Sequence, residues 1–196
     1  MKVALLVIDV QVDFCSGGAL AASNTRSLIA PLNRVVGSCV AFGVPVAFTR
    51  DWHPKNHGSF VAQGGRWPPH CVQDTKGAAF ATGLNVPRQS VLINKGTEIQ
   101  DDGYSMFVGT ELEDWLRTGT IGELAVCGIA TEYCVLESTR DALMKGFQTV
   151  VLADLVRPID EHPGDGAAAL REMQHLGAAI RESLAWAQDR RIPLHC

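Results

Sequence analysis

The chain has 196 residues, of which 46% are hydrophobic and 19% charged, and its formal net charge is −4. This length and composition fit one globular domain spanning 1–196 and exclude a disordered or fibrous chain. The negative charge, without a basic run, argues against a nucleic-acid partner, and no apolar run of about 18 residues supports a membrane location. With no signal-peptide pattern, we expect a cytoplasmic protein, either a monomer or a homo-oligomer.

Short runs rich in Val, Ile and Leu recur along the chain and are typical of buried parallel strands. They lie at 2–9, 44–49, 90–94, 122–128 and 147–153, with a short sixth candidate at 178–181. Segments with helical spacing separate them, at 26–42, 110–118, 131–146 and 163–176. This alternation predicts an α/β fold in which helices cover both faces of a parallel sheet.

Two local signals refine the helices. Thr110 and Glu113 have the spacing of a capping box, which predicts a helix start at Thr110. In the segment 131–146, apolar side chains repeat at an interval of seven residues and should face the sheet.

The long stretch 52–88 has no strand or helix period, and ordered loops of this length are usually functional.

Four reactive residues follow the predicted strands at their carboxyl ends, where ligands bind in open α/β sheets. They are Asp9, Asp51, Lys95 and Cys134. Because parallel strands end at one edge of a sheet, we expect these side chains to converge on one rim.

Cys134 is the candidate nucleophile among the six cysteines. It should lie in the first turn of a helix that opens near Thr131, where free N–H groups and the helix dipole favour a thiolate. Cys39 and Cys127 fall inside a predicted helix and strand, and we interpret them as core thiols. A reducing compartment argues against a disulfide framework.

Asp9 and Lys95 are charged residues at the ends of apolar segments, where an isolated charge is costly to bury. Pairing the two would reduce that cost. The pair could serve catalysis beside Cys134, or it could simply hold two strands together.

A second cluster lies in the sequence Asp51-x-His53-x-x-x-His57, with His70 further on. One carboxylate and two or three imidazoles suit one divalent metal ion. We expect zinc, with iron or manganese as alternatives. By spacing alone, these histidines could equally belong to a polar loop without a metal.

Three aromatic residues near these segments, Phe14, Trp67 and Tyr104, lie outside any periodic apolar face. Such side chains can enclose a flat ring as substrate-binding residues, or they can pack beneath long loops.

Taken together, the motifs resemble the nicotinamidase (pyrazinamidase) branch of the isochorismatase-like cysteine hydrolases, nearly end to end. The resemblance rests on 9–14, 49–54, 67–80, 94–96, 102–105 and 128–135, where the last segment reads Gly-Ile-Ala-Thr-Glu-Tyr-Cys-Val. It implies a six-stranded parallel sheet in the order 3-2-1-4-5-6. The family's catalytic triad falls on Asp9, Lys95 and Cys134.

The resemblance also implies a cis peptide bond before Ala130, with the N–H groups of Ala130 and Cys134 facing one oxyanion. The family's metal ligands fall on Asp51, His53 and His70, and His57 stays open as a fourth ligand. Four residues depart from the usual pattern and should alter the fine shape of the pocket: Val12, Asp74, Met106 and Glu132.

The implied activity is that of a metal-containing cysteine amidohydrolase. It would deaminate nicotinamide to nicotinate and ammonia, and pyrazinamide to pyrazinoate, through a thioester on Cys134, with the metal orienting the pyridine nitrogen. Two alternatives stay open: another small-amide hydrolase of the same superfamily, and a non-catalytic binding protein on this fold.

Overall fold

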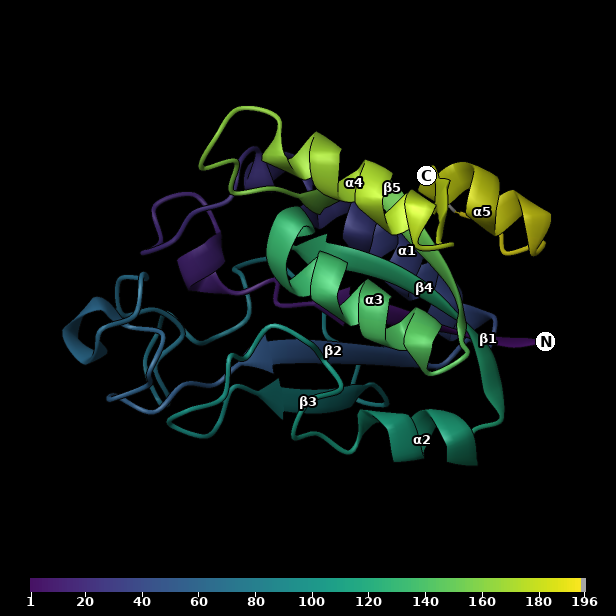
Figure 1. The fold of residues 1–196 in the computed structure, drawn as a ribbon. Coiled ribbons are helices and arrows are strands. Elements are labelled where there is room, and N and C mark those ends of the chain that lie inside the picture. Colours follow the sequence, from purple (N-terminus) through teal and green to yellow (C-terminus); the bar gives the residue numbers. More distant parts are fainter. Residues whose placement is uncertain (195–196) are drawn as a thin grey trace.

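The structure, a computed structural model, describes residues 1–194 and contains a six-stranded parallel sheet in the order β3-β2-β1-β4-β5-β6 (Figure 1). The strands are β1 (Lys2–Ile8), β2 (Val46–Asp51), β3 (Val91–Lys95), β4 (Ile121–Ile129), β5 (Gln148–Arg157) and β6 (Ala179–Arg181). The predicted fold class and strand order are therefore confirmed.

β1 is the centre of the sheet. It pairs with β2 on one side and β4 on the other, with Leu6 opposite both Ala47 and Val126. Its residues from Ala4 to Ile8 are completely buried, because helices cover both faces of the sheet. This explains why the strand is a continuous apolar run rather than an alternating one.

The helices divide between the two faces of the sheet. The helices α1 (Ile29–Ala41) and α5 (Ser183–Asp189) pack with the odd-numbered residues of β1, such as Leu5. The other face carries α2 (Leu112–Thr118), α3 (Leu136–Met144) and α4 (Asp165–His175), which pack with the even-numbered residues of β1. In Figure 1, α3 lies in front of the sheet and α1 behind it. Among the described residues, no helix is both long and apolar enough to cross a membrane.

Several element boundaries differ from the sequence-based ones. The segment 26–42 begins with a 3-10 turn before α1, and 131–146 begins with a π-helical turn at Thr131–Val135 before α3. The last helix, α5 (7 residues), was not predicted from the sequence. The predicted apolar repeat at intervals of seven residues is confirmed. Val135 and Ala142 are fully buried, and Leu136 and Leu143 pack with them in the hydrophobic core on this face of the sheet.

The predicted capping box at Thr110 is wrong. The Thr110 hydroxyl donates to the Met106 carbonyl and accepts a hydrogen bond from Leu112 N–H, so α2 begins at Leu112. Glu113 does not reach back to the helix start. Its carboxylate instead pairs with Arg117 and Lys145, two cations that compete successfully for it.

The long segment 52–88 contains no strand and, as helix, only the 3-10 turn Val61–Gln63, yet it is anchored to the rest of the molecule. Isolated bridges join Gln11 to Phe80 and His53 to Val72. In Figure 1 this blue segment gathers beyond the arrowheads of β2 and β3, at the carboxyl end of the sheet. It therefore forms one wall of the region where the sheet topology places a ligand.

Gly128 provides a test of the packing between the central strands. It has a φ of +119°, and an added Cβ would lie 2.0 Å from the Ile8 carbonyl oxygen. Gly177 has a similar φ of +110° but open space around it. We expect Gly177→Ala to lower the free energy of unfolding by about 1 kcal/mol, the cost of positive φ. Gly128→Ala should lower it by at least about 3 kcal/mol, because β1 must also move.

Urea unfolding monitored by circular dichroism measures both losses. Equal losses for the two variants would show that β1 and β4 are not in close contact at Gly128.

Candidate active site

The four reactive residues from separate strand ends lie together. Asp9 follows β1, Asp51 and Lys95 end β2 and β3, and Cys134 lies in the π-helical turn after β4. All four side chains are buried. Side-chain oxygen or sulfur atoms of Asp9, Asp51 and Cys134 lie within 4.8 Å of one another.

The Lys95 ammonium lies at the centre of this group. Its Nζ is 2.8 Å from Asp9 Oδ2, 2.5 Å from Asp51 Oδ1 and 3.3 Å from Cys134 Sγ, and it also donates to the Gly103 carbonyl. The sequence pointed to a Lys95–Asp9 pair but not to the contact with Asp51. Lys95 thus connects the triad residues to the Asp51–His53 cluster.

Asp9 is held by its backbone as well as its side chain. Its φ is +49°, in the left-handed region, which is unusual for a residue other than glycine. Its N–H donates to the Thr49 carbonyl at 3.3 Å, and the Thr49 hydroxyl donates to Asp9 Oδ1 at 2.6 Å. One oxygen is thereby occupied by Thr49, while Oδ2 faces Lys95.

Burial and charge set the protonation of this group. Burial raises the pKa of Asp9 to about 6, against the lowering effect of Lys95. Burial also acts to raise the pKa of Asp51, but Lys95 and His53 hold that pKa well below its usual range. Burial opposes the charge on Lys95, yet the two carboxylates keep its pKa well above the ordinary value. Lys95 is therefore a cation at neutral pH.

The resting form of Cys134 differs from the sequence-based expectation. Burial raises the pKa of the Cys134 thiol well above its ordinary value, with Lys95 acting in the opposite direction. The side chain is 5% exposed and lies near two carboxylates, so the helix start does not suffice to ionise it. The raised pKa favours the thiol over the thiolate, so a base beside the sulfur is needed to remove its proton.

Ala130 lies directly after β4, and the Ile129–Ala130 peptide bond is cis, as the family resemblance implied. Within residues 1–194, the Ala130 N–H makes no hydrogen bond, although its carbonyl accepts from Tyr133 and Val135. A donor without a partner at the edge of a pocket is suited to bind a substrate oxygen.

The structure brings together Asp51, His53 and His70 as a candidate metal centre. All three are buried, and one ligand atom from each lies within 4.8 Å of the others. His53 Nδ1 is 2.8 Å from the Gly96 carbonyl, and His70 Nδ1 is 2.8 Å from the Pro68 carbonyl. A carbonyl only accepts, so each Nδ1 carries the hydrogen and each Nε2 is left as a ligand. These residues fit a divalent metal ion.

His57 is not in this set. Its ring stacks on His53 with 4.1 Å between centroids, and its Nδ1 is 2.7 Å from the Ser59 hydroxyl. Its buried Nε2 has no hydrogen-bond partner among the described residues. His57 thus stacks on His53, and its nitrogens are not among the ligand atoms of Asp51, His53 and His70 that lie within 4.8 Å of one another.

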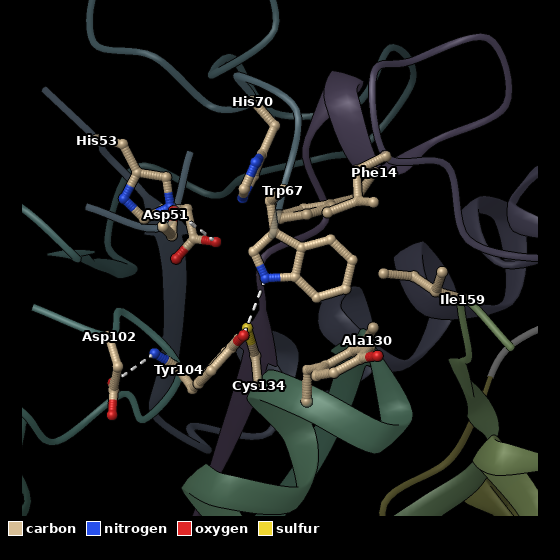
Figure 2. Close-up of a pocket in the computed structure, with 13 residues that line it drawn as sticks. Phe14, Asp51, His53, Trp67, His70, Asp102, Tyr104, Ala130, Cys134 and Ile159 are labelled. Carbon is tan, nitrogen blue, oxygen red and sulfur yellow. Dashed lines mark hydrogen bonds and ion pairs between the residues drawn. The ribbon is translucent and has the colours of Figure 1, made fainter. Parts of the chain in front are cut away.

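The predicted aromatic residues line one pocket of about 370 Å³, counting the space open to solvent, together with Cys134, Ala130 and the candidate metal ligands (Figure 2). Phe14 packs against His70, and Trp67 Nε1 donates to the Tyr104 hydroxyl at 2.9 Å. In Figure 2 the metal-ligand candidates lie on the opposite side of the pocket from Ile159.

Tyr133 and Ile159 also line this pocket and were missed from the sequence. Tyr133 is adjacent to Cys134 in the chain and could have been found from that position. Ile159 lies in the loop after β5, and no local pattern marks it.

A doubly wound parallel sheet with a buried cysteine, carboxylate and lysine at its carboxyl edge has the groups that a hydrolase with a cysteine nucleophile requires. The model of the isochorismatase domain matches residues 3–183. The chain belongs to the isochorismatase domain family and is a hydrolase.

Several similar proteins align with nearly the whole length of this chain. The nicotinamidase of Escherichia coli (strain K12) is 37% identical over 208 residues, covering 95% of this chain and 98% of the relative. The crystal structure of the pyrazinamidase of Pyrococcus horikoshii in complex with zinc has a TM-score of 0.88 and 41% identity, covering 93% of this chain and 99% of that one. PnC1 from L. infantum in complex with nicotinate has a TM-score of 0.85 and 35% identity, covering 94% of each chain. The resemblance found in the sequence is thereby confirmed.

The metal centre can be tested without measuring activity. His70→Ala removes one of three ligands, so we expect metal affinity to fall at least about 100-fold and the purified protein to lose its ion. Metal content by inductively coupled plasma mass spectrometry is the measurement. His175→Ala is the control, because His175 is an exposed residue of α4. A His70→Ala protein that retained wild-type metal content and affinity would exclude His70 as a ligand.

Proposed function

We propose that residues 1–196 form a single-domain, metal-containing cysteine amidohydrolase that converts nicotinamide to nicotinate and ammonia, and pyrazinamide to pyrazinoate. The observation that carries the proposal is the position of Lys95 Nζ between Asp9, Asp51 and Cys134, at one side of a pocket lined by aromatic rings. The nicotinamidase of E. coli and the nicotinate complex from L. infantum support this choice of substrate.

In the proposed reaction, Asp9 accepts the proton of the Cys134 thiol as the sulfur attacks the amide carbon. The N–H groups of Ala130 and Cys134 donate to the oxygen, which becomes negatively charged. Asp9 then returns the proton to the leaving nitrogen, and ammonia departs from a thioester. A water molecule gives a proton to Asp9 and attacks the thioester. Asp9 returns that proton to the departing sulfur, which restores the thiol, and the product acid loses its own proton to solvent to become the carboxylate.

Lys95 supports each of these charge changes without transferring a proton. It stays charged between the two carboxylates, so its ammonium stabilises the thiolate as it forms 3.3 Å away. Its contacts with Asp51 and the Gly103 carbonyl fix the ammonium in place. The cation is therefore preorganised before the substrate arrives.

The divalent ion would be held by Asp51, His53 and His70. Their donor atoms favour zinc, with iron or manganese as alternatives. When bound, the ion would supply a Lewis-acidic position for the ring nitrogen of the substrate. Phe14, Trp67 and Tyr104 enclose the ring, which orients the carboxamide toward Cys134.

Ammonia release from nicotinamide by the purified protein tests the proposed activity. Cys134→Ala should lower kcat by at least about 1000-fold, because the thioester cannot form. Cys127→Ala is the control: Cys127 is buried in β4, so this variant should keep its activity and lose about 1 kcal/mol of stability. Residual turnover above that limit in Cys134→Ala would assign the nucleophile elsewhere, and a wild-type protein without ammonia release would reject nicotinamide as substrate.

The raised pKa of Asp9, about 6, predicts the acidic limb of the pH profile. Below that pH the carboxyl is protonated and cannot accept the thiol proton, so kcat/KM should fall about tenfold per pH unit. Above it, the base is available and kcat/KM levels off. In Asp9→Asn the overall rate should collapse and this limb should disappear. The acidic limb is measured from profiles of kcat/KM between about pH 4.5 and 8. An unchanged limb in Asp9→Asn would show that Asp9 is not the group that accepts the proton.

A further inference from the structure

The carboxylate of Glu161 joins three separate segments at the pocket. Arg66 Nη2 lies 2.5 Å from Glu161 Oε2, and the Tyr133 hydroxyl donates to the same oxygen at 2.5 Å. Arg66 belongs to the long segment 52–88, Tyr133 to the π-helical turn that carries the nucleophile, and Glu161 to the loop after β5. One side chain thus links two loops that flank the pocket to the turn at its base.

The residues bound by Glu161 hold the aromatic side chains of the pocket. The Arg66 guanidinium lies 4.5 Å from the centroid of the Trp67 ring. Trp67 meets Tyr133 edge to face, with 5.2 Å between centroids, and Tyr104 stacks on Tyr133 at 5.8 Å. With the Trp67–Tyr104 hydrogen bond, these contacts form one connected set of rings. Releasing Glu161 would leave Arg66 and Tyr133 held in this set by their ring contacts alone.

Glu132 fixes the other side of the same loop. Its Oε1 accepts hydrogen bonds from the N–H groups of Ile159 and Asp160, at 2.8 and 2.7 Å. Ile159 lines the pocket, so Glu132 holds this wall against the turn that carries Cys134. The loop after β5 is therefore anchored by Glu132 to the turn that carries Cys134, and Glu161 joins the same loop to Arg66 of the segment 52–88.

The reacting atoms lie behind this arrangement. Cys134 is 5% exposed, Ala130 3% and Trp67 5%, so the surrounding side chains leave little of the sulfur open to solvent. The Arg66 and Glu161 side chains are 59% and 33% exposed, and an ion pair of this kind contributes little to stability.

From these contacts we infer that Glu161 is a specificity-determining residue that, through Arg66 and Tyr133, limits the size of the ring that reaches Cys134. The inference deepens the proposed function and rests on it for the identity of the substrate. Access to the Cys134 sulfur can nevertheless be measured without turnover.

The first experiment compares two maleimides of different size, N-methylmaleimide and N-(1-pyrenyl)maleimide, on the full chain. Both alkylate a thiol by the same addition, so the ratio of their rates at Cys134 reports access rather than thiol reactivity. Peptide mapping by mass spectrometry separates Cys134 from the other cysteines. In Glu161→Ala, we expect the preference for the small reagent to fall at least about fivefold relative to wild type.

Two further variants make this result specific. Tyr133→Phe keeps the ring and removes the hydroxyl that Glu161 accepts from, so it should shift the ratio in the same direction. Glu172→Ala is the matched control: Glu172 also pairs with an arginine, Arg140, between α3 and α4, but among the described residues neither of them bonds a residue that lines the pocket, as Glu161 bonds Tyr133. This control should leave the ratio unchanged. Circular dichroism confirms that each variant is folded.

The second experiment measures kcat/KM for nicotinamide and for quinoline-3-carboxamide, which adds a fused ring. Glu161→Ala should raise the relative kcat/KM of the larger amide at least about fivefold. If the wild type does not hydrolyse nicotinamide but the maleimide ratio shifts, the proposed function fails and the role of Glu161 in access stands. If nicotinamide is hydrolysed and neither ratio moves beyond the Glu172→Ala control, the inference about Glu161 is wrong.

Discussion

The site depends on the ion pairs that the buried ammonium of Lys95 forms. It lies between the carboxylates of Asp9 and Asp51 and beside the sulfur of Cys134, and all four residues are removed from water. Two carboxylates this close would repel each other strongly without a cation between them. Lys95 therefore permits an acid–base group and a candidate metal ligand to share one small volume. Removing a single member of such a buried set leaves uncompensated charge, which is strongly destabilising.

The sheet supplies the scaffold for this group of charges. β1, β2 and β3 are neighbours, and each ends in a charged residue of the site, while β4 leads into the turn that carries Cys134. Rigid strands buried on both faces hold these ends at fixed distances. The loops beyond them then need to supply only the walls of the pocket, which is the usual division of labour in open α/β folds.

Burial gives the site its chemistry as well as its shape. The same loss of water raises the pKa of Asp9 toward neutrality and raises that of the Cys134 thiol, which favours the uncharged form of both side chains. A helix-start thiolate, which the sequence suggested, would need a more exposed or more positive setting. The surrounding aromatic rings help to exclude water from the site. The hydrogen bond from Tyr133 to Glu161 joins these rings to a partly exposed carboxylate.

Much of the fold and the candidate site follows from local sequence. Buried parallel strands must be nearly continuous in apolar residues, so their positions and the polar residues that end them are visible in the chain itself. Asp9, Asp51, Lys95 and Cys134 are detectable for that reason, and the metal-ligand candidates follow from the donor chemistry of Asp51, His53 and His70. Family motifs added the strand order and the cis peptide bond before Ala130.

Tertiary structure decided the features that depend on contacts between distant segments. Examples are the Lys95–Asp51 pairing, the raised pKa of Cys134, the stacking of His57 on His53 and the Glu161 contacts. Each depends on residues whose relative positions no local pattern specifies. The failed capping box at Thr110 has the same origin, because Lys145 from another segment binds Glu113. Sequence periodicity records which residues are buried and where strands end, whereas partners and pKa values depend on which groups the fold brings together.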